Sequence, residues 1–461
     1  MPASFPLSAF KAYDIRGTVP DPLDERFAHS LGLALAQQAL ALGLGRIAVG
    51  YDGRASGPTL EQALVEGLSE GGLDCLRLGM VPTPVVYYAA HEHSQGSGVA
   101  ITGSHNPPEY NGFKLMLGGT TLHGDAIRAL HGLMTGAPAP AARQAGALQS
   151  LPVLDAYLAR ITGDVHLARP MRVAIDCGNG VGGVIAERLF STLGCTVDAL
   201  YCAVDAGFPN HHPDPADPAN LQDLIRHVRN SDCELGLAFD GDADRLGVVT
   251  RSGQIIWPDR QLILFARDVL ARNAGAPILF DVKCSRHVAA AITEAGGQAR
   301  MSRTGHSLIK AAMAECDAPL AGEMSGHIFF GERWFGFDDG LYAGARLLEI
   351  LSRHANPSTV LEALPQDIST PEIKLALREG EPHALIERLQ AQGEFPTSHT
   401  RITMDGVRAE YADGFGLARA SNTTPVVVLR FEGETPEAIA RIQEEFRRAL
   451  LALEPALTLP F

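Results

Sequence analysis

Three stretches of this sequence follow one plan, and that repetition constrains the fold more than any other feature. Each begins with a short apolar run rich in β-branched residues. A polar or Gly-rich loop, an amphipathic helical stretch, a Gly stop and a second apolar run follow. The stretches begin at Arg46, Arg172 and Pro277. Continuous apolar strands are typical of sheets that helices cover on both faces. We therefore predict three similar mixed α/β domains.

The C-terminal part is built differently. Residues 401–421 and 425–431 are strand-like, and residues 436–453 form a helical pattern with Pro436 at its start. This order predicts a smaller α+β domain. The first linker is expected in the Ala/Pro/Gly-rich stretch 135–150, and a turn at 251–253 and prolines at 365–371 suggest the later boundaries. The expected domains are 1–150, 151–253, 254–367 and 368–461.

Length, charge and cysteine usage limit the function classes. A chain of 461 residues is long enough for three or four domains. A net charge of −15, from 38 basic and 53 acidic side chains, disfavours nucleic acid as a partner. The seven cysteines are dispersed without a CxxC spacing, which argues against a disulfide framework or a zinc site. No signal peptide is visible and no apolar run reaches the ~18 residues of a membrane span. We expect a cytoplasmic protein without membrane contact.

An acidic loop is the clearest candidate metal site. Residues 240–245 read DGDADR directly after the apolar run LGLAF. Asp240, Asp242 and Asp244 offer hard oxygen ligands in one loop, which suits Mg²⁺. An EF-hand is excluded because Arg245 and Arg251 stand where Gly and Glu would be required. A solvated acidic turn is the plain alternative.

A candidate nucleophile lies in the stretch TGSHNPPEYNGFK at 102–114, where two prolines exclude a helix. A serine such as Ser104 needs a base or charge neutralisation to react. His105 and Lys114 supply nearby polar groups, and Lys114 could act as a base if its pKa is lowered. A turn stabilised by Ser and Asn side chains is the alternative. A phosphorylated Ser104 would offer Mg²⁺ one further oxygen.

These stretches belong to a larger set of motifs. In order, the chain contains YDIRG at 13–17, TGSHNPPEYNGFK at 102–114, FPNHHPDP at 208–215, DGDADR at 240–245, GEMSGH at 322–327 and RASNTTP at 419–425. Together they resemble the α-D-phosphohexomutase family, in particular its bacterial phosphomannomutase/phosphoglucomutase branch, over essentially the whole chain. The family's usual Thr-Ala-Ser-His-Asn-Pro has Gly103 in place of Ala here, which leaves the serine role intact but suggests a more flexible loop.

The resemblance implies roles for individual residues around a central cleft formed by four domains. Ser104 would carry the phosphate and bind Mg²⁺ together with Asp240, Asp242 and Asp244. Lys114 would be the general base. The other implied catalytic residues are His105, Arg245 and Arg16. The implied substrate-binding residues are Tyr13, Lys283, His306, Glu323, Ser325, Arg419, Ser421, Asn422 and Thr423. Glu323 and Ser325 would hold sugar hydroxyls, and the residues from Arg419 to Thr423 would hold the phosphate that is not reacting.

The resemblance also implies the reaction. Phosphate would move between the 1- and 6-oxygens of mannose or glucose through a hexose 1,6-bisphosphate, which would also act as activator. The expected partners are small sugar phosphates, and the expected state is a monomer.

Other functions remain open from the residues alone. Gly178, Gly180 and Gly183 satisfy GxGxxG, with Asp198 at a suitable distance for a ribose, which is a dinucleotide hypothesis. A phosphatase or a metal-dependent glycosyltransferase would also use an acidic loop. A non-enzymatic sugar-phosphate sensor could keep the same fold. His306 and Lys283 have structural alternatives as well.

Overall fold

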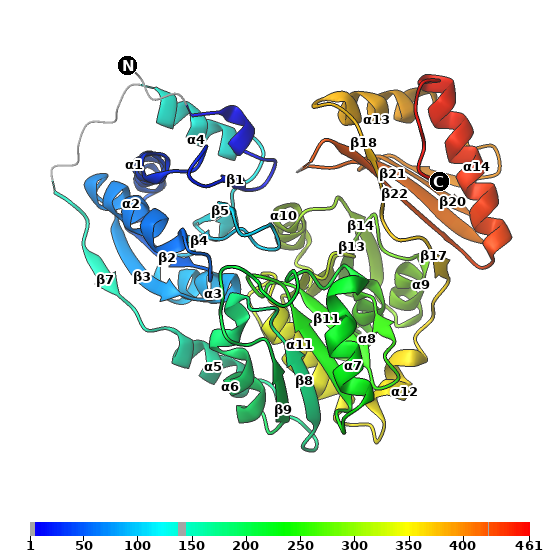
Figure 1. The fold of residues 1–461 in the computed structure, drawn as a ribbon, viewed down its shortest axis with the longest axis horizontal. Helices are drawn as coiled ribbons and strands as arrows, with labels where there is room; N and C mark the ends of the chain where they lie inside the picture. The colour runs from blue at the N-terminus through cyan, green and yellow to red at the C-terminus, as the bar shows by residue number, and fades with distance from the viewer. Residues whose placement is uncertain (1–4, 137–143, 423) are drawn as a thin grey trace.

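The computed structural model describes residues 5–136, 144–422 and 424–461. The chain forms four β-sheets, each with its own helices, and the four units follow one another in chain order along an arc (Figure 1).

The first unit has a seven-stranded sheet ordered β1-β5-β4-β2-β3-β7, with β6 paired to β5. Its strands are β1 (Ile15–Thr18), β2 (Arg46–Tyr51), β3 (Asp74–Met80), β4 (Gly98–Ile101), β5 (Tyr110–Leu117), β6 (Thr120–Thr121) and β7 (Leu148–Ser150). Its helices are α1 (Glu25–Ala41), α2 (Gly57–Glu70), α3 (Thr83–His93) and α4 (Asp125–Thr135), and Leu7–Ala9 is a 3-10 turn.

Both faces of this sheet are covered, as the apolar strand pattern predicts. Ile47 and Val49 of β2 join the core cluster that contains residues of α1, α2 and α4, whereas Ala48 joins the cluster that contains residues of α3. The expected linker 135–150 is only in part a linker. Residues 137–143 lie outside the described residues, but Leu148–Ser150 pair in parallel with β3 and extend the sheet.

The second unit has the strand order β12-β11-β10-β8-β9. Its strands are β8 (Arg172–Asp176), β9 (Thr196–Leu200), β10 (Leu235–Phe239), β11 (Leu246–Thr250) and β12 (Ile255–Ile256). Its helices are α5 (Leu154–Thr162), α6 (Ala186–Thr192) and α7 (Gln222–Arg229), with 3-10 turns at Val181–Val184 and Pro218–Leu221. The turn expected at 251–253 connects β11 to β12, with Gly253 in the left-handed region (φ 88°), so the sheet continues to Ile256.

The third unit has the strand order β14-β13-β15-β16. Its strands are β13 (Pro277–Asp281), β14 (Gln298–Ser302), β15 (Leu320–Gly322) and β16 (Ile328–Phe330). Its helices are α8 (Pro258–Leu270), α9 (Arg286–Glu294), α10 (His306–Cys316), α11 (Gly340–Leu351) and α12 (Pro357–Glu362).

The three units share one topology, which confirms the prediction of three similar α/β domains. In each, the strand that opens the repeated stretch lies between two parallel neighbours, and the second neighbour continues into an antiparallel hairpin. The matching orders are β3-β2-β4-β5, β9-β8-β10-β11 and β14-β13-β15-β16. The hairpins β4–β5, β10–β11 and β15–β16 therefore occupy equivalent positions.

The fourth unit consists of an antiparallel sheet and two helices among the described residues, which agrees with the α+β domain predicted for the C-terminal part. Its order is β17-β22-β21-β20-β19, with β18 paired to β22. Its strands are β17 (Ile368–Ser369), β18 (Ile373–Ala376), β19 (Thr400–Ile402), β20 (Val407–Tyr411), β21 (Gly414–Ala420) and β22 (Val426–Gly433). Its helices are α13 (Glu381–Gln392) and α14 (Pro436–Leu453). Thr435 caps α14 by accepting the N–H of Ala438, and Pro436 follows it at the favoured first position.

The four units are joined to different extents. One apolar cluster runs through parts of the first three units, whereas the fourth has its own core. Val282 of the third unit packs with Phe415 and Leu417 of the fourth. Arg408 donates to the carbonyl oxygens of Val282 and Cys284 at 2.6 Å, which ties the two units beside this contact. Across the three described ranges, none of the helices combines the length and the apolar character needed to cross a bilayer.

Candidate active site

Three of the four motif loops occupy corresponding places in the first three sheets. Residues 102–109 connect β4 to β5, residues 240–245 connect β10 to β11, and residues 323–327 connect β15 to β16. In each of these hairpins the first strand is also part of the parallel sheet, so its carboxyl end presents the loop at the edge where α/β proteins bind ligands. Residues 421–425 connect β21 to β22 in the fourth unit. The shared topology explains why motifs far apart in sequence converge.

Ser104 lies in a strained and buried position. Its φ is 50°, in the left-handed region that non-glycine residues rarely adopt, and the residue is 3% exposed. Its Oγ donates to Oδ2 of Asp240 at 3.0 Å and lies 3.3 Å from Nδ1 of His105. A Cβ on Gly241 would come within 2.2 Å of the Ser104 carbonyl oxygen, so glycine there permits the serine loop to approach the acidic loop.

Arg54 was not among the site residues predicted from the sequence. It holds the serine loop through hydrogen bonds to backbone carbonyl oxygens. It is 2% exposed and donates to three backbone carbonyls of the loop, those of Ser104 (2.9 Å), Asn106 (2.6 Å) and Pro107 (2.5 Å), and to the carbonyl of Tyr110 at the start of β5 (2.8 Å). A methyl group on Gly103 would come within 2.4 Å of the Arg54 guanidinium. Gly103 thus leaves room for the Arg54 guanidinium beside the loop, and the expectation of a more flexible loop stays a prediction.

Asp52 completes this support from the end of β2. Its carboxylate pairs with Nε of Arg54 at 3.1 Å and accepts from the Thr102 hydroxyl (2.8 Å) and the Gly103 N–H (3.1 Å). The signal in the sequence was the DGR at 52–54, which follows the first of the repeated strands.

The three aspartates of the acidic loop are all fully buried, and their ligand oxygens lie within 4.8 Å of one another. Oδ1 of Asp242 has no hydrogen-bond partner among the described residues, although its other oxygen accepts from Thr83 and Lys114. An unpaired buried carboxylate oxygen is costly without a cation. The donor set is all oxygen, as a hard cation requires. The loop is therefore able to hold a metal ion.

Lys114 lies between two of these carboxylates. Its Nζ donates to Oδ2 of Asp242 at 2.8 Å and to Oδ2 of Asp244. Burial would lower the pKa of Lys114, but these two carboxylates hold it well above its usual value. In this arrangement Lys114 is an ammonium ion, whereas the sequence interpretation of a base requires a lowered pKa.

Arg245 and His105 flank the serine. Arg245 donates from Nε to Asp240 (2.9 Å) and from Nη1 to Asp214 (3.2 Å), while its buried Nη2 has no partner within the described ranges. Burial lowers the pKa of His105 well below its usual range, and Arg245 and Arg16 add to this effect. His105 is therefore neutral. Arg16 is held by Asp14 at 2.6 Å and by Asn106.

His327 connects the sugar-loop motif to the acidic loop, and the sequence analysis assigned it no role. Its Nδ1 lies 2.8 Å from the Ser325 hydroxyl and 3.2 Å from Oε2 of Glu323, and its Nε2 lies 3.3 Å from Oδ1 of Asp244. Burial would lower the pKa of His327, but Asp244 and Glu323 raise it to about 10. In the sequence, the one indication of a role for His327 was its place as the last residue of the GEMSGH motif.

The first and third units meet at Tyr13 and His306. The two rings pack edge to face with centroids 5.1 Å apart, and burial raises the pKa of Tyr13 to about 12. His306 is buried, and its Nε2 has no hydrogen-bond partner in the part of the chain that the structure describes. Glu323 accepts from the N–H of Gly305 at 2.6 Å, which places the His306 helix next to the sugar-loop motif.

The fourth unit contributes a cationic edge. Arg419 on β21 donates from Nε to Asp405 at 3.1 Å, and its buried Nη2 has no partner among the described residues. Asp405 also accepts from the N–H of Thr304, so it fixes Arg419 beside the third unit. Lys283 donates to Glu372 at 2.8 Å, and this cation lowers the pKa of Glu372 to about 2. Ser421 and Asn422 are partly exposed in the adjoining loop, and Thr423 lies outside the described residues.

Gly180 and Gly183, two of the glycines that suggested a dinucleotide-binding site, pack against neighbouring backbone. A Cβ on Gly180 would come within 2.8 Å of the Gly241 carbonyl oxygen, and one on Gly183 within 1.9 Å of the Cys202 carbonyl oxygen. Asp198 on β9 pairs with Arg172 and His227. These contacts account for the residues that suggested a nucleotide site.

The fold and the site together define a class. Three repeated α/β domains and an antiparallel fourth domain bring a buried serine, a carboxylate trio and several cations to one place, an arrangement suited to phosphoryl transfer. The sequence matches the Phosphoglucomutase/phosphomannomutase alpha/beta/alpha domain I over residues 7–137, domain II over 155–253 and domain III over 257–368, and the C-terminal domain over 372–449. The chain belongs to the phosphoglucomutase/phosphomannomutase family.

Individual relatives match along their whole length. The chain is 56% identical to a phosphoglucomutase of Neisseria gonorrhoeae over 459 residues, covering 99% of this chain and 100% of the relative. It is 52% identical to the phosphomannomutase/phosphoglucomutase of Pseudomonas aeruginosa PAO1, covering 99% and 98%. A crystal structure of a phosphoglucomutase/phosphomannomutase family protein from Burkholderia thailandensis matches with a TM-score of 0.95 at 52% identity, covering 99% of this chain and 100% of the other.

Proposed function

We propose that this chain interconverts the 1- and 6-phosphates of glucose and mannose, and that Ser104 carries the phosphate between them. The observation that supports this proposal most strongly is that Asp240 accepts hydrogen bonds from both the buried Ser104 hydroxyl and Nε of Arg245. Nη2 of the same Arg245 has no partner among the described residues. A phosphate on Ser104 would lie next to this cation. Family membership supports the reaction class, because phosphohexomutases exchange hexose 1- and 6-phosphates.

Asp240, Asp242 and Asp244 would hold Mg²⁺ together with an oxygen of phosphorylated Ser104. When bound there, the ion would neutralise phosphate charge. The unpaired oxygen of Asp242 and the all-oxygen donor set support this assignment. Arg245 and Arg16 would add positive charge from side chains that are already fixed by Asp240, Asp214 and Asp14.

The transfer needs a proton acceptor for the sugar hydroxyl and a proton for Ser104 Oγ as the phosphate leaves it. We assign both roles to Lys114, which would accept the proton of the sugar hydroxyl and afterwards return it to Ser104 Oγ. Its two carboxylate partners control its protonation. Lys114 keeps its proton while their negative charges are uncompensated. When a cation compensates these charges, Lys114 can lose that proton to solvent and then accept one from the sugar hydroxyl. The neutral His105, 3.3 Å from Ser104 Oγ, would orient that oxygen.

Glu323 and Ser325 would bind two hydroxyls of the sugar, and His327 would keep both side chains in place. Tyr13, His306 and Lys283 would line the same site. Arg419, Ser421, Asn422 and Thr423 would bind the phosphate that is not reacting. Nη2 of Arg419 has no partner among the described residues, and its planar guanidinium suits a phosphate. After the first transfer the hexose 1,6-bisphosphate would turn end for end and return its other phosphate to Ser104. Free bisphosphate would act as activator by phosphorylating Ser104.

We further propose a cytoplasmic monomer. All seven cysteines are free, as in a reducing compartment, and one chain supplies every residue of the proposed site. The net charge of −15 disfavours polyanionic partners such as nucleic acid.

The test is product analysis with glucose 1-phosphate and with mannose 1-phosphate, each with Mg²⁺ and a trace of the bisphosphate. Phosphorus NMR should show each 1-phosphate converted to its 6-phosphate with total ester phosphate unchanged. Release of inorganic phosphate without the isomer would make the protein a phosphatase. Binding without turnover would make it a sensor.

A further inference from the structure

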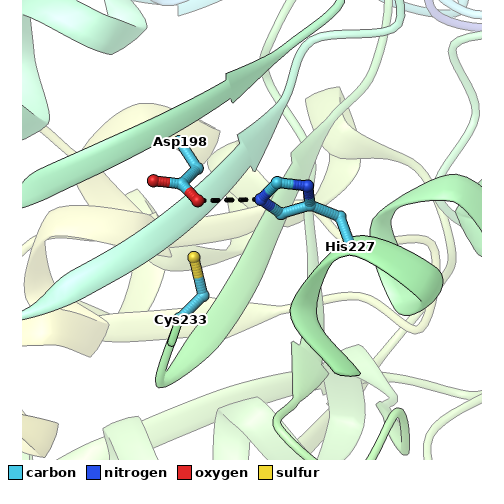
Figure 2. Close-up of side chains that lie close together, drawn as sticks. All are labelled: Asp198, His227 and Cys233. Carbon is cyan, nitrogen blue, oxygen red and sulfur yellow. Dashed lines mark hydrogen bonds and ion pairs between the residues drawn. The ribbon is translucent and has the colours of Figure 1, made fainter. Parts of the chain in front are cut away.

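A second group of metal-binding side chains lies in the second unit, away from the proposed active site. Asp198 on β9, His227 on α7 and Cys233 just before β10 come from three separate elements. Their ligand atoms, a carboxylate oxygen, an imidazole nitrogen and a thiol sulfur, all lie within 4.8 Å of one another. Figure 2 shows the sulfur of Cys233 pointing toward the Asp198 carboxylate and the His227 ring.

Hydrogen bonds hold the Asp198 carboxylate and the His227 ring of this group in place. Nε2 of His227 lies 2.9 Å from Oδ2 of Asp198, the contact drawn as a dashed line in Figure 2. The other carboxylate oxygen, Oδ1, accepts from Arg172 at 2.9 Å. Outer hydrogen bonds of this kind orient a ligating carboxylate in metal sites. Arg172 thus occupies Oδ1, leaves Oδ2 facing His227, and also interacts with the Cys233 thiol.

The chemistry of the three ligands selects the ion. Sulfur and imidazole nitrogen favour Zn²⁺ and related softer cations over Mg²⁺, which prefers oxygen alone. We propose that Asp198, His227 and Cys233 bind one Zn²⁺ ion, with water as the fourth ligand. The Cys233 residue is buried, whereas the His227 side chain is 36% exposed, so an ion can enter from the His227 side.

The exchange balances in charge and protons. The Cys233 thiol releases one proton to solvent and becomes a thiolate. The proton on Nε2 of His227, which the Asp198 carboxylate accepts, moves to Nδ1 of the same ring by exchange with solvent, so the ring stays neutral. Two metal bonds then replace the His227–Asp198 hydrogen bond. Thiolate, carboxylate and the Arg172 guanidinium sum to one negative charge beside a divalent cation, so the bound site carries one positive charge. No oxidation or reduction is involved.

The site would join three elements around the second sheet. Cys233 lies two residues before β10, the strand that ends at the acidic loop. An ion bound to β9, α7 and this turn would stabilise the domain, because a ligand that binds only the folded state raises its melting temperature. The earlier expectation that the cysteines form no zinc site rested on their spacing in sequence, and here a single cysteine meets its partners only through the fold.

The experiment uses the full chain, stripped with a chelator and kept in excess Mg²⁺ so that the all-oxygen loop does not compete. Co²⁺ is added as a spectroscopic probe, since a cobalt–thiolate bond gives a near-ultraviolet charge-transfer band. We expect one equivalent to bind, Zn²⁺ to abolish the band, and Zn²⁺ alone to raise the melting temperature.

Variants identify the ligands. Cys233→Ala should remove the band, and His227→Gln should weaken Zn²⁺ binding by at least ~10-fold, the smallest effect usual for loss of an outer-shell partner. The matched control is Cys202→Ala. Cys202 and Cys177 are a pair of thiols in the same unit that could also bind Co²⁺, with their sulfurs 3.6 Å apart. A band that survives Cys233→Ala but disappears in Cys202→Ala would overturn the proposal. So would the absence of any band, or an unchanged Zn²⁺ affinity in His227→Gln. Unchanged phosphate isomerisation by Cys233→Ala in Mg²⁺ would show that this variant is folded.

Discussion

Arg54 donates a hydrogen bond of 2.9 Å to the carbonyl oxygen of Ser104, from a guanidinium that also binds two further carbonyls of the same loop and one at the start of β5. This contact fixes the backbone of Ser104 in a left-handed conformation that the serine would not adopt by itself. The position of the serine hydroxyl thus depends on a residue about fifty positions earlier in the chain.

Replacing Arg54 with lysine should lower kcat far more than it changes KM for glucose 1-phosphate. Lysine cannot reproduce a planar fork that serves four acceptors. Loss of one or two charge-assisted hydrogen bonds costs about 2–4 kcal/mol, or ~30- to ~1000-fold. The matched control is Arg46→Lys at the start of β2, the strand that leads into the Arg54 loop, where the arginine is exposed. Steady-state kinetics decide the question, and an unchanged kcat with a normal melting temperature would show that Arg54 does not position the serine.

Asp242→Asn should remove most of the effect of Mg²⁺ on thermal stability. The variant loses one charge and one of the two carboxylates that hold Lys114. Melting curves with and without Mg²⁺ measure the difference, with Asp232→Asn as an exposed control. A wild-type shift in the variant, together with normal activity at limiting Mg²⁺, would place the ion elsewhere.

Arg419→Ala should weaken turnover of 1-phosphates and 6-phosphates by a similar factor, about 30- to 1000-fold for a loss of 2–4 kcal/mol. One pocket that holds whichever phosphate is not reacting serves both directions equally. Release of free bisphosphate should also rise, because the intermediate is held less firmly. The comparison is kcat/KM for glucose 1-phosphate and for glucose 6-phosphate, with Arg401→Ala on β19 as control. A loss in one direction alone would require two separate phosphate pockets.

Asp339→Asn should make the protein more stable at neutral pH. Asp339 caps α11 and accepts from the Tyr157 hydroxyl, and burial raises its pKa to about 7. Because the folded state keeps a proton that the unfolded chain has lost, stability falls as pH rises from about 4 to about 7. Asparagine keeps the cap without this cost, which is at most about 4 kcal/mol for a shift of roughly three pKa units.

The corresponding measurement is the melting temperature of Asp339→Asn and wild type between pH 4 and pH 8. The difference should grow up to pH 7 and then stay constant. Asp155→Asn, at an exposed carboxylate on α5, should give no such trend. A constant difference across this range would mean that Asp339 is ionised in the folded protein throughout.

The repeated stretches allowed the three α/β domains to be predicted, because apolar strands and amphipathic helices leave a local pattern. The motifs likewise singled out Ser104 and the acidic loop, which lie in contact in the structure, and their catalytic roles stay predictions. Arg54 and His327 could not be found in this way, since their partners lie in other loops and only the fold brings them together. Lys114 shows a further limit. The sequence suggested a base, but its pKa depends on two aspartates more than 120 positions away. Within the same loop Asp240 pairs with Arg245 and Asp244 faces His327, so the charge of the acidic loop is better compensated than its sequence suggests.

The most direct test of the account is transfer of phosphate through Ser104. The purified wild-type protein, incubated with glucose 1,6-bisphosphate, should gain the mass of one phosphate. Peptide mapping should place that phosphate on Ser104, and addition of glucose 1-phosphate should remove it as isomer forms. Ser104→Ala should neither gain the mass nor convert glucose 1-phosphate. Isomerisation by Ser104→Ala at the wild-type rate, or a phosphate found on another residue, would contradict the account.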